Sequence, residues 1–314
     1  MTFALIPNEA PSSSLRRIVL EQIDGAILQL EREDNLNDGI HEARKHFKRV
    51  RAVLRLSRGA LPAATYRTEN QFFRDQGRIL SPVRDSAVYI ETIDMLRRRY
   101  GQQLSDASFC RLRRSLVEEH GSVLRTFAGD EQLIPSMIER LKGARQRALD
   151  WTFHHSEFSL IANGLRRTYR RGLKEKSDAY AQPTTENFHF WRKRVKYLWY
   201  QFQILGPLWP ALTKVMAREC DQLADGLGEE HDLAVLQESP LVQEMVRADK
   251  GSADLLFAIA AQERSRLRRT ATPLAERIYV ESPKQFTFRM EGYWQAYRRQ
   301  SPCDSIQKAQ PASP

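Results

Sequence analysis

The sequence is poor in cysteine and has no long apolar run. Its 314 residues include three widely spaced cysteines, Cys110, Cys220 and Cys303, too few for a disulfide framework or a cysteine-rich metal site. No stretch approaches the roughly 18 to 20 apolar residues of a membrane-spanning helix. The first residues have neither a basic region nor the long apolar core of a secretory signal. We therefore expect a globular protein of the reducing cytoplasm, with no membrane association.

The motifs of common enzyme classes are also missing. The sequence has no P-loop, no Rossmann glycine fingerprint, no nucleophile elbow, no HExxH and no CxxC. The adjacent Glu229 and Glu230 cannot hold one metal ion from a single helical face, and His41 and His46 lack the i, i+4 spacing of a helical zinc pair. We therefore expect a binding protein without metal or cofactor, and a phosphohydrolase is the less favoured enzyme alternative.

Charge is the first informative feature that is present. Lys and Arg total 49 against 39 Asp and Glu, a net charge of +10, and 38 of the 49 basic residues are arginine. A guanidinium group is a planar fork that can hold a phosphate by two hydrogen bonds, whereas an ammonium is a point charge. This balance favours an anionic partner, such as a nucleic acid, a membrane surface or another phosphate polymer.

Helical periodicity dominates the chain, and strand signals are scarce. Apolar residues recur at i, i+3, i+4 and i+7 in segments such as 15–33 and 41–57. Short breaks at 35–39, 58–62 and 81–82 separate such segments, as in bundles of antiparallel helices. The pattern predicts an all-α protein.

The helical pattern divides the chain into two similar parts. We predict roughly five helices in a first bundle, 14–150, and roughly five more in a second bundle, 151–300. The ends, 1–13 and 301–314, are rich in Pro, Ser, Ala and Gln, so we expect a mobile N-terminus and a disordered C-terminal tail.

An internal repeat indicates how the two parts are related. The pattern HxxRKxxK begins at His41 and again at His189, 148 residues later, and LSPVRDSAV (80–88) matches LGEEHDLAV (227–235) at an offset of 147. Residues 1–150 hold 25 basic and 20 acidic residues, and the remainder holds 24 and 19, so each part is net +5. The repeat predicts duplicated antiparallel bundles about a pseudo-two-fold axis, with a basic cleft or pore between them.

Each copy of the HxxRKxxK pattern places cations on one helical stripe. At about 100° per residue these positions share a face. The first stripe contains His41, Arg44, Lys45, Lys48, Arg51 and Arg55, and the second contains His189, Arg192, Lys193 and Lys196. Like charges at i, i+4 destabilise a helix by a few tenths of a kcal/mol per pair, so the stripes favour an anion that faces them. A solvated surface face is the alternative interpretation.

Further cations could line the same cleft. The segment GLRRTYRRGLKEK places three of them at i, i+4 and i+8. The others lie in or just before the two copies of the downstream motif, 80–88 and 227–235. These residues are Arg74, Arg78, Arg84, Arg166, Arg170, Lys174 and His231. Asp85 and Asp232 follow Arg84 and His231 and could orient the basic groups through ion pairs.

The paired histidines have two interpretations. We place His41 and His189 in the first turns of their helices, after the expected N-caps Asp38 and Thr184. There they could donate to a phosphate beside bare backbone amides, or they could be capping and packing residues.

At these residues the chain resembles the CHAD family, whose name abbreviates conserved histidine α-helical domain. The paired HxxRKxxK helices, the LRRTYRRG element and the two downstream segments carry the resemblance, over roughly 14–300. It implies two helical bundles around a basic cleft or pore that binds inorganic polyphosphate, often at polyphosphate granules. By this resemblance both HxxRKxxK stripes line the site, with Arg166 and Arg170 nearby. The ExExK motif of the triphosphatase barrel that often accompanies the family is absent, so hydrolysis is not implied.

The sequence thus predicts a non-catalytic polyphosphate-binding protein. The main alternative is a protein that binds single-stranded nucleic acid or polyanions in general. It rests on Trp191, Tyr197, Trp199 and Tyr200, which interleave with the second stripe and could stack on bases. We expect Trp191 and Trp199 to pack in the core instead.

Overall fold

The computed structural model describes residues 3–7, 9–32, 35–104 and 107–300. These residues form α-helices, one short 3₁₀ helix (Gly206–Leu208) and connecting turns, and they contain no β-strand. The helices of the first part are α1 (Pro11–Leu30), α2 (Leu36–Leu56), α3 (Ala63–Ile79), α4 (Ser81–Tyr100), α5 (Ala107–Ala128) and α6 (Leu133–Leu149). Those of the second part are α7 (Ser159–Ala181), α8 (Thr185–Ile204), α9 (Pro210–Gln237), α10 (Pro240–Ala248), α11 (Lys250–Ile278) and α12 (Pro283–Gln300).

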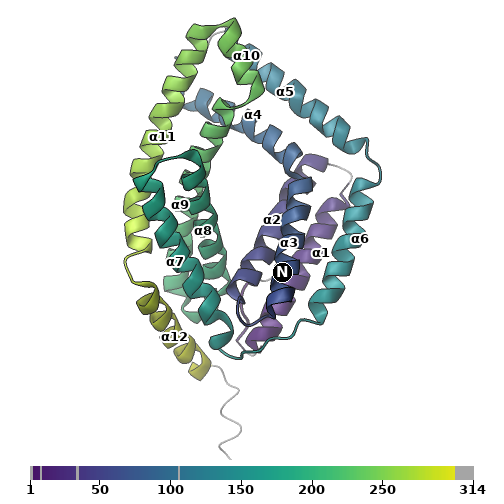
Figure 1. Cartoon of the computed structure of the whole chain (residues 1–314), viewed down its shortest axis with the longest axis vertical. Coiled ribbons are helices and arrows are strands. Elements are labelled where there is room, and N and C mark those ends of the chain that lie inside the picture. Colours follow the sequence, from purple (N-terminus) through teal and green to yellow (C-terminus); the bar gives the residue numbers. More distant parts are fainter. Residues whose placement is uncertain (1–2, 8, 33–34, 105–106, 301–314) are drawn as a thin grey trace, which may run out of the picture.

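The two parts of the chain stand side by side and meet at both ends, so that the ribbons trace a ring (Figure 1). The larger apolar core takes residues from both parts, and in it α2 packs against α7 and α8. A second core lies where α4 and α5 meet α9, α10 and α11. The two cores hold the inner helices α2, α4, α8 and α9 in fixed positions around the middle of the ring.

The all-α prediction is confirmed, and some details differ. Each part has six described α-helices rather than about five. The predicted boundary at 150 falls in the connection between α6 and α7. Near the start of the chain, the buried Leu5 donates its amide to the Ile204 carbonyl at 2.9 Å, so part of the segment expected to be mobile packs against the second part. The tail predicted at 301–314 lies outside the described residues.

One of the two expected helix caps is wrong. The N-cap of α2 is Asn35, whose side chain accepts the amide of Asp38, because the helix begins three residues earlier than the sequence suggested. The other expected cap is confirmed, since Thr184 accepts the amide of Asn187 at the start of α8.

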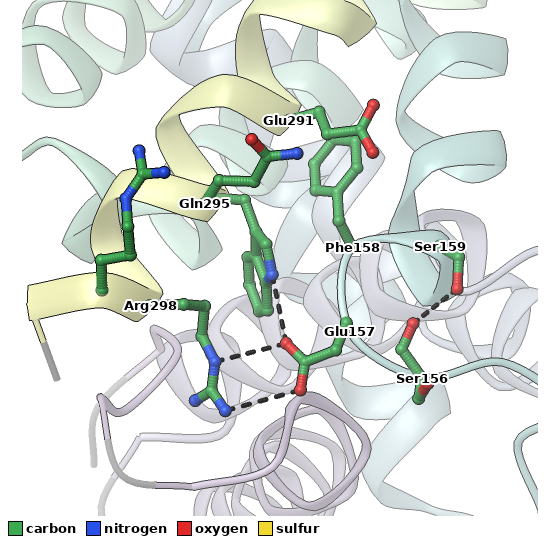
Figure 2. A pocket seen from close by; sticks show the side chains of 9 residues that line it. Ser156, Glu157, Phe158, Ser159, Glu291, Gln295 and Arg298 are labelled. Carbon is green, nitrogen blue, oxygen red and sulfur yellow. Dashed lines mark hydrogen bonds and ion pairs between the residues drawn. The ribbon is translucent and has the colours of Figure 1, made fainter. Parts of the chain in front are cut away.

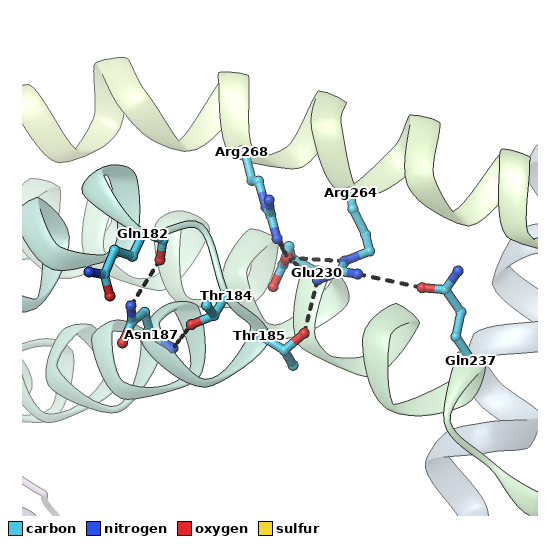
Figure 3. Close-up of polar contacts among 8 residues, drawn as sticks. All are labelled: Gln182, Thr184, Thr185, Asn187, Glu230, Gln237, Arg264 and Arg268. Atoms are coloured by element: carbon cyan, nitrogen blue, oxygen red, sulfur yellow. Dashed lines mark hydrogen bonds and ion pairs between the residues drawn. The ribbon is translucent and has the colours of Figure 1, made fainter.

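A buried carboxylate joins three helices of the second part (Figure 3). Glu230 of α9 is fully buried and accepts hydrogen bonds from Arg264 and Arg268 of α11, at 3.0 and 2.6 Å. Arg264 also donates to the Thr185 hydroxyl at the start of α8, at 3.2 Å. Burying a charge is unfavourable unless it is paired and hydrogen-bonded, so these arginines compensate Glu230 and fix α11 against α8 and α9.

A second carboxylate anchors the last helix (Figure 2). Glu157 lies in the α6–α7 connection with a positive φ of 49° and accepts the Trp294 indole N–H of α12 at 3.2 Å. Arg298 of α12 forms an ion pair with the same carboxylate at 3.3 Å.

None of the described helices combines the length and the apolar composition that crossing a membrane requires.

Candidate anion-binding site

The four segments that carry the repeated motifs lie next to one another in space. The two HxxRKxxK stripes are on α2 and α8, and the two downstream motifs are on α4 and α9. Helix α2 contacts both α4 and α8, and α9 contacts both α4 and α8. Charged residues that are far apart in the sequence are therefore collected on the inner helices.

A pocket bounded by α2, α3 and α8 has a cationic lining. Its volume is about 390 Å³, and its charged residues are eight arginines and lysines with no carboxylate. They are Arg44, Lys48, Arg51, Arg55, Arg74, Arg78, Lys193 and Arg194, and we call this the cationic pocket. Asp75, just outside the lining, pairs with Arg74 at 3.1 Å and with Arg78 at 3.7 Å. The other six lining cations make no ion pair with a carboxylate of the described residues, apart from Arg194 with Glu175.

Arg44 is fixed by the junction between α3 and α4. Its guanidinium donates to the Gly77 carbonyl and to the Ser81 hydroxyl, the latter at 2.7 Å. Its Nε atom is buried and has no hydrogen-bond partner in the described protein. Arg44 is therefore positioned by backbone and hydroxyl groups and makes no ion pair in the described chain, although the charge of nearby Asp85 partly offsets its own.

Lys48 lies where the charges of three helices converge. Its side chain is open to solvent, but the surrounding protein and the nearby charges of Arg44 and Arg192 lower the pKa of the ammonium to about 7. Smaller contributions come from Lys196 and Arg84. The site therefore disfavours its own positive charge and would be stabilised by an anion.

Arg192 reaches across α9. A Cβ atom on Gly228 would lie 3.1 Å from the Arg192 Nε, so this glycine leaves space for the guanidinium. The Arg192 Nε is buried without a hydrogen-bond partner in the described chain. Its neighbour Lys193 lies 4.7 Å from the centre of the Phe190 ring, and burial followed by nearby arginine charges lowers the Lys193 pKa. Both residues offer donors to an incoming ligand.

The histidines lie beside this charge cluster in neutral form. Burial, followed by the charge of Arg84, lowers the pKa of His41. Burial also lowers the pKa of His189 to about 3 and that of His231 to about 4. The expectation that His41 and His189 occupy first turns is wrong, because α2 begins at Leu36 and α8 at Thr185. Bare helix-terminal amides therefore do not explain their position.

Several predicted site residues have carboxylate partners. Arg84 forms a two-pronged ion pair with Glu91, at 2.5 and 2.7 Å, and Lys45 pairs with Glu42 at 2.8 Å. Lys196 lies 3.1 Å from Asp225 and 4.3 Å from the centre of the Trp199 ring. An anion must compete with these carboxylates, so each of the three cations contributes less to anion binding than Lys48 does.

The two aspartates of the repeated motif lie close to cations without direct pairing. Burial raises the pKa of Asp85 and of Asp232, and neighbouring arginines oppose the shift in both. In the described part of the chain neither makes an ion pair within 4.0 Å, so the expected pairs are absent there. No group of three His, Cys, Asp or Glu among the described residues is arranged to hold a metal ion.

The structure does not bring the predicted cations of α7 to the cationic pocket. Arg166 and Arg170 are exposed, and the exposed Lys174 pairs with Asp178 of its own helix at 2.5 Å. Arg167 and Arg171, one position further along, face α2 instead. The small residues Gly164, Thr168 and Gly172 mark the packed face of α7, and that signal identifies the flanking arginines.

Arg74 and Arg194 also line the pocket; the sequence predicted Arg74 there together with Arg78, but not Arg194. Arg194 follows the HxxRKxxK stripe directly but belongs to the α7-facing side of α8, where it contacts Glu175 at 3.3 Å. Arg74 lies one helical turn before Arg78 on α3, and this spacing predicts it.

The aromatic residues of α8 are turned inward. Trp191 is fully buried, as predicted, and Tyr197 and Tyr200 are 7% and 4% exposed. Trp199 is only half-buried, although it packs against the core. Few ring faces are therefore free to stack on bases.

Comparison with known proteins identifies the family of the chain and a similar fold. A model of the CHAD domain matches residues 18–239, most of the chain. The fold is similar to the crystal structure of the CHAD domain from the plant Ricinus communis, with a TM-score of 0.52 and 16% identity over 94% of this chain and 95% of that one. At this identity the similarity shows the fold alone. No curated protein matches the chain. Because the family model matches more than half of the chain, the chain belongs to the CHAD domain family.

Proposed function

We propose that the protein binds inorganic polyphosphate, without catalysis, along the cationic pocket. The observation that carries the proposal is the lining of this pocket, eight Arg and Lys side chains with no carboxylate. Each internal phosphate of the polymer bears about one negative charge, and cations that replace its condensed counterions gain binding free energy, as in nucleic-acid complexes. Helix-mounted cations that already repel one another need little rearrangement to receive such a chain.

We further propose that the two parts of the chain are a duplication and that the bound polymer runs in a cleft between them. The pairing of α2 with α8 and of α4 with α9, each pair carrying one repeated motif, supports this. Beyond the pocket, the cleft would continue past Lys48 toward Arg192, whose charges influence each other. Association with polyphosphate granules follows from the same binding and is testable by co-localisation with a polyphosphate stain.

A nucleic acid fits this lining less well. Single-stranded nucleic acids gain about 1 to 3 kcal/mol per base from stacking on aromatic faces. Here Trp191, Tyr197 and Tyr200 are buried, and of the pocket's other rings Phe47 and Phe73 are buried while Phe190 is half-buried beneath the Lys193 ammonium. A cationic pocket with few exposed ring faces favours a polymer that consists of phosphate alone.

A competition titration tests the proposal. Labelled polyphosphate of one length would be displaced by unlabelled polyphosphate, single-stranded RNA, duplex DNA and heparin at one fixed ionic strength. Polyphosphate should compete at least about tenfold better per charge than the others, which corresponds to about 1.4 kcal/mol. Equal competition per charge would replace the proposal with general polyanion binding. Incubation of polyphosphate with protein and Mg²⁺ should release no phosphate above the protein-free rate, and release would contradict the non-catalytic part.

Paired charge reversals locate the site. Lys48→Glu with Lys193→Glu removes two cations that make no ion pair in the described chain, so the fold should survive. The matched control is Lys214→Glu with Lys284→Glu, two exposed lysines on α9 and α12. The first pair should weaken polyphosphate binding more than tenfold beyond the control, which has the same net charge. Equal loss in both variants would mean that the cationic pocket is not the site.

A further inference from the structure

A second, smaller pocket lies beside the cationic pocket and is lined by five arginines. Its volume is about 50 Å³. The arginines are Arg55, Arg58, Arg167, Arg171 and Arg194, and we call this the arginine pocket. It lies where the end of α2 meets α3, α7 and α8, and it shares Arg55, Arg194 and Tyr197 with the lining of the cationic pocket.

The close approach of two helices creates this concentration of charge. A Cβ atom on Gly164 of α7 would lie 1.9 Å from the Leu56 carbonyl oxygen of α2, so only glycine permits the contact. The approach brings Arg167 and Arg171 of α7 next to the arginines at the end of α2. The close contact between α2 and α7 therefore holds these like charges near one another.

Aromatic rings, rather than carboxylates, hold two of these arginines. The Arg55 guanidinium lies 3.9 Å from the centre of the Tyr197 ring, and that of Arg58 lies 4.8 Å from the centre of the Tyr66 ring. Stacking on a ring fixes the plane of a guanidinium and leaves its N–H groups at the edge free to donate. Arg55 also donates to the Asn70 side chain at 2.9 Å, which fixes its direction.

The arginine pocket is short of negative charge. Its neighbour Glu175 contacts Arg171 at 3.5 Å and Arg194 at 3.3 Å, and the other three arginines make no ion pair with the described residues. Five guanidinium groups against one carboxylate leave four positive charges. The Arg167 Nε is buried and has no hydrogen-bond partner among the described groups. Burial and the charges of neighbouring arginines lower the Arg167 pKa, as expected where guanidinium groups crowd together.

The dimensions limit the ligand to one compact group. A water molecule needs roughly 10 to 15 Å³ of such space, so about 50 Å³ accepts a cluster of a few waters or a single phosphoryl group. A running polymer cannot pass through it. The end group of a phosphate chain differs from an internal one because it has a second ionisable oxygen, with a pKa near 6 in phosphate monoesters, and so carries close to two negative charges at neutral pH.

We propose that the arginine pocket binds the terminal phosphoryl group of a polyphosphate chain whose interior lies in the adjoining cationic pocket. The inference rests on the proposed function and adds recognition of the chain end. The terminal group brings the extra charge to the place where unpaired positive charge is most concentrated. The shared wall of Arg55, Arg194 and Tyr197 makes the two pockets continuous for one ligand.

The test compares polyphosphate of one length with free ends and with both ends blocked as amine phosphoramidates. Wild-type protein should bind the free-ended chain about tenfold or more tightly at fixed ionic strength. Equal affinity for the two chains would overturn chain-end recognition and leave the proposed function standing. If the wild-type protein binds neither chain, that result would instead overturn the proposed function, and chain-end recognition with it.

Variants connect this preference to the pocket. Arg58→Gln with Arg167→Gln removes two arginines that make no ion pair in the described chain. Affinity for the free-ended chain should fall to that for the blocked chain, while affinity for the blocked chain changes less than twofold. The matched control, Arg166→Gln with Arg170→Gln, alters exposed arginines of the same helix and should keep the preference. Equal weakening of both chains by the pocket variant would contradict the proposal.

Inorganic phosphate distinguishes an end group from a free anion. When phosphate is added as a competitor, the apparent affinity for the free-ended chain should fall only to that for the blocked chain. The reason is that phosphate occupies the arginine pocket alone. Failure of millimolar phosphate to affect the free-ended chain, together with no change in the Arg58→Gln, Arg167→Gln variant, would overturn the assignment.

Discussion

His189 and His231 stack on each other across the contact between α8 and α9. Their ring centres are 4.1 Å apart with planes inclined by 30°. The Nδ1 atoms of both rings are buried and have no hydrogen-bond partner among the described groups. Burial is the main cause that lowers their pKa values, to about 3 and about 4, and the positive charges nearby add to it. The two rings are therefore neutral in the unliganded protein at neutral pH, and they pack as a pair rather than act as cations.

The first prediction concerns stability in mild acid. An unfolded histidine has a pKa near 6.5, above that of either folded ring, so below about pH 6.5 the unfolded state binds more protons and stability falls as the pH drops toward 4. At pH 5 each ring should lower the free energy of unfolding by about 1 to 2 kcal/mol relative to pH 7. Urea midpoints measured from pH 7.5 to 5 check this.

The control for this prediction removes the titrating pair. His189→Gln with His231→Gln should flatten the pH dependence, with a residual slope from His46, whose pKa burial lowers to about 4. A wild-type midpoint that rises between pH 7 and 5 would contradict the assignment of neutral, buried rings.

The second prediction assigns the pH dependence of polyphosphate binding to Lys48. The surrounding protein and the charges of Arg44 and Arg192 lower its pKa to about 7, so protonation rises as the pH falls from 8 to 6. Binding should strengthen several-fold over this range, because a fully charged ammonium faces the polymer. Isothermal titration in two buffers of different ionisation enthalpy would show proton uptake on binding near pH 7.5.

Two variants isolate this effect. Lys48→Arg keeps the charge at every pH and should remove most of the pH dependence while retaining the affinity measured at pH 6. Lys48→Gln should bind weakly at all pH values. If the pH response is the same in Lys48→Arg and wild type, another group is responsible, such as His41.

The helical stripes were predictable because they depend only on local periodicity. A helix places i and i+4 on one face wherever it lies. Because the repeat puts the same stripe on two helices, the sequence could also predict that both stripes face one site, where Lys48 and Arg192 lie near each other. Helix phase on α7 was not predictable from charge alone. Arg166 and Arg167 are adjacent in the sequence, and only the contact of Gly164 with α2 decides that Arg167 faces inward.

The buried histidine pair depends on tertiary packing in the same way. The repeat placed His189 in the second HxxRKxxK motif and His231 in the second downstream motif, but said nothing about whether their rings touch. Their pKa values depend on burial between α8 and α9, which no spacing along one helix reveals. The aromatic side chains were easier, because a large ring in a bundle such as Trp191 is most often in the core.

The third prediction concerns the buried carboxylate of α9. Glu230 compensates Arg264 and Arg268, and Glu230→Ala leaves both guanidinium groups partly buried without their acceptor. Loss of one partner of a buried ion pair destabilises by about 3 to 5 kcal/mol, so the melting temperature should fall sharply. The control is Glu139→Ala, which breaks an exposed pair with Lys142 and should change stability by less than about 1 kcal/mol. Similar effects of the two substitutions would contradict the role given to Glu230.

The fourth prediction concerns the contact between α2 and α7. Gly164→Ala would place a methyl group 1.9 Å from the Leu56 carbonyl oxygen, and backbone cannot move aside as a flexible side chain can. The helices must separate, so stability should fall by about 2 kcal/mol or more, as for other overpacked sites. Thermal unfolding followed by circular dichroism measures the loss.

Gly226 of α9 provides the opposite control. A Cβ atom there would meet nothing within 4 Å, so Gly226→Ala should stabilise the protein by about 0.5 to 1 kcal/mol through helix propensity alone. Opposite signs for the two glycines would show that contact with Leu56, rather than helix propensity, determines the residue at 164. Because the same contact brings Arg167 next to Arg55 and Arg58, Gly164→Ala should also remove the preference for free-ended polyphosphate at temperatures where the variant remains folded. A variant as stable as wild type, with the preference retained, would mean that the close approach of α2 and α7 does not build the arginine pocket.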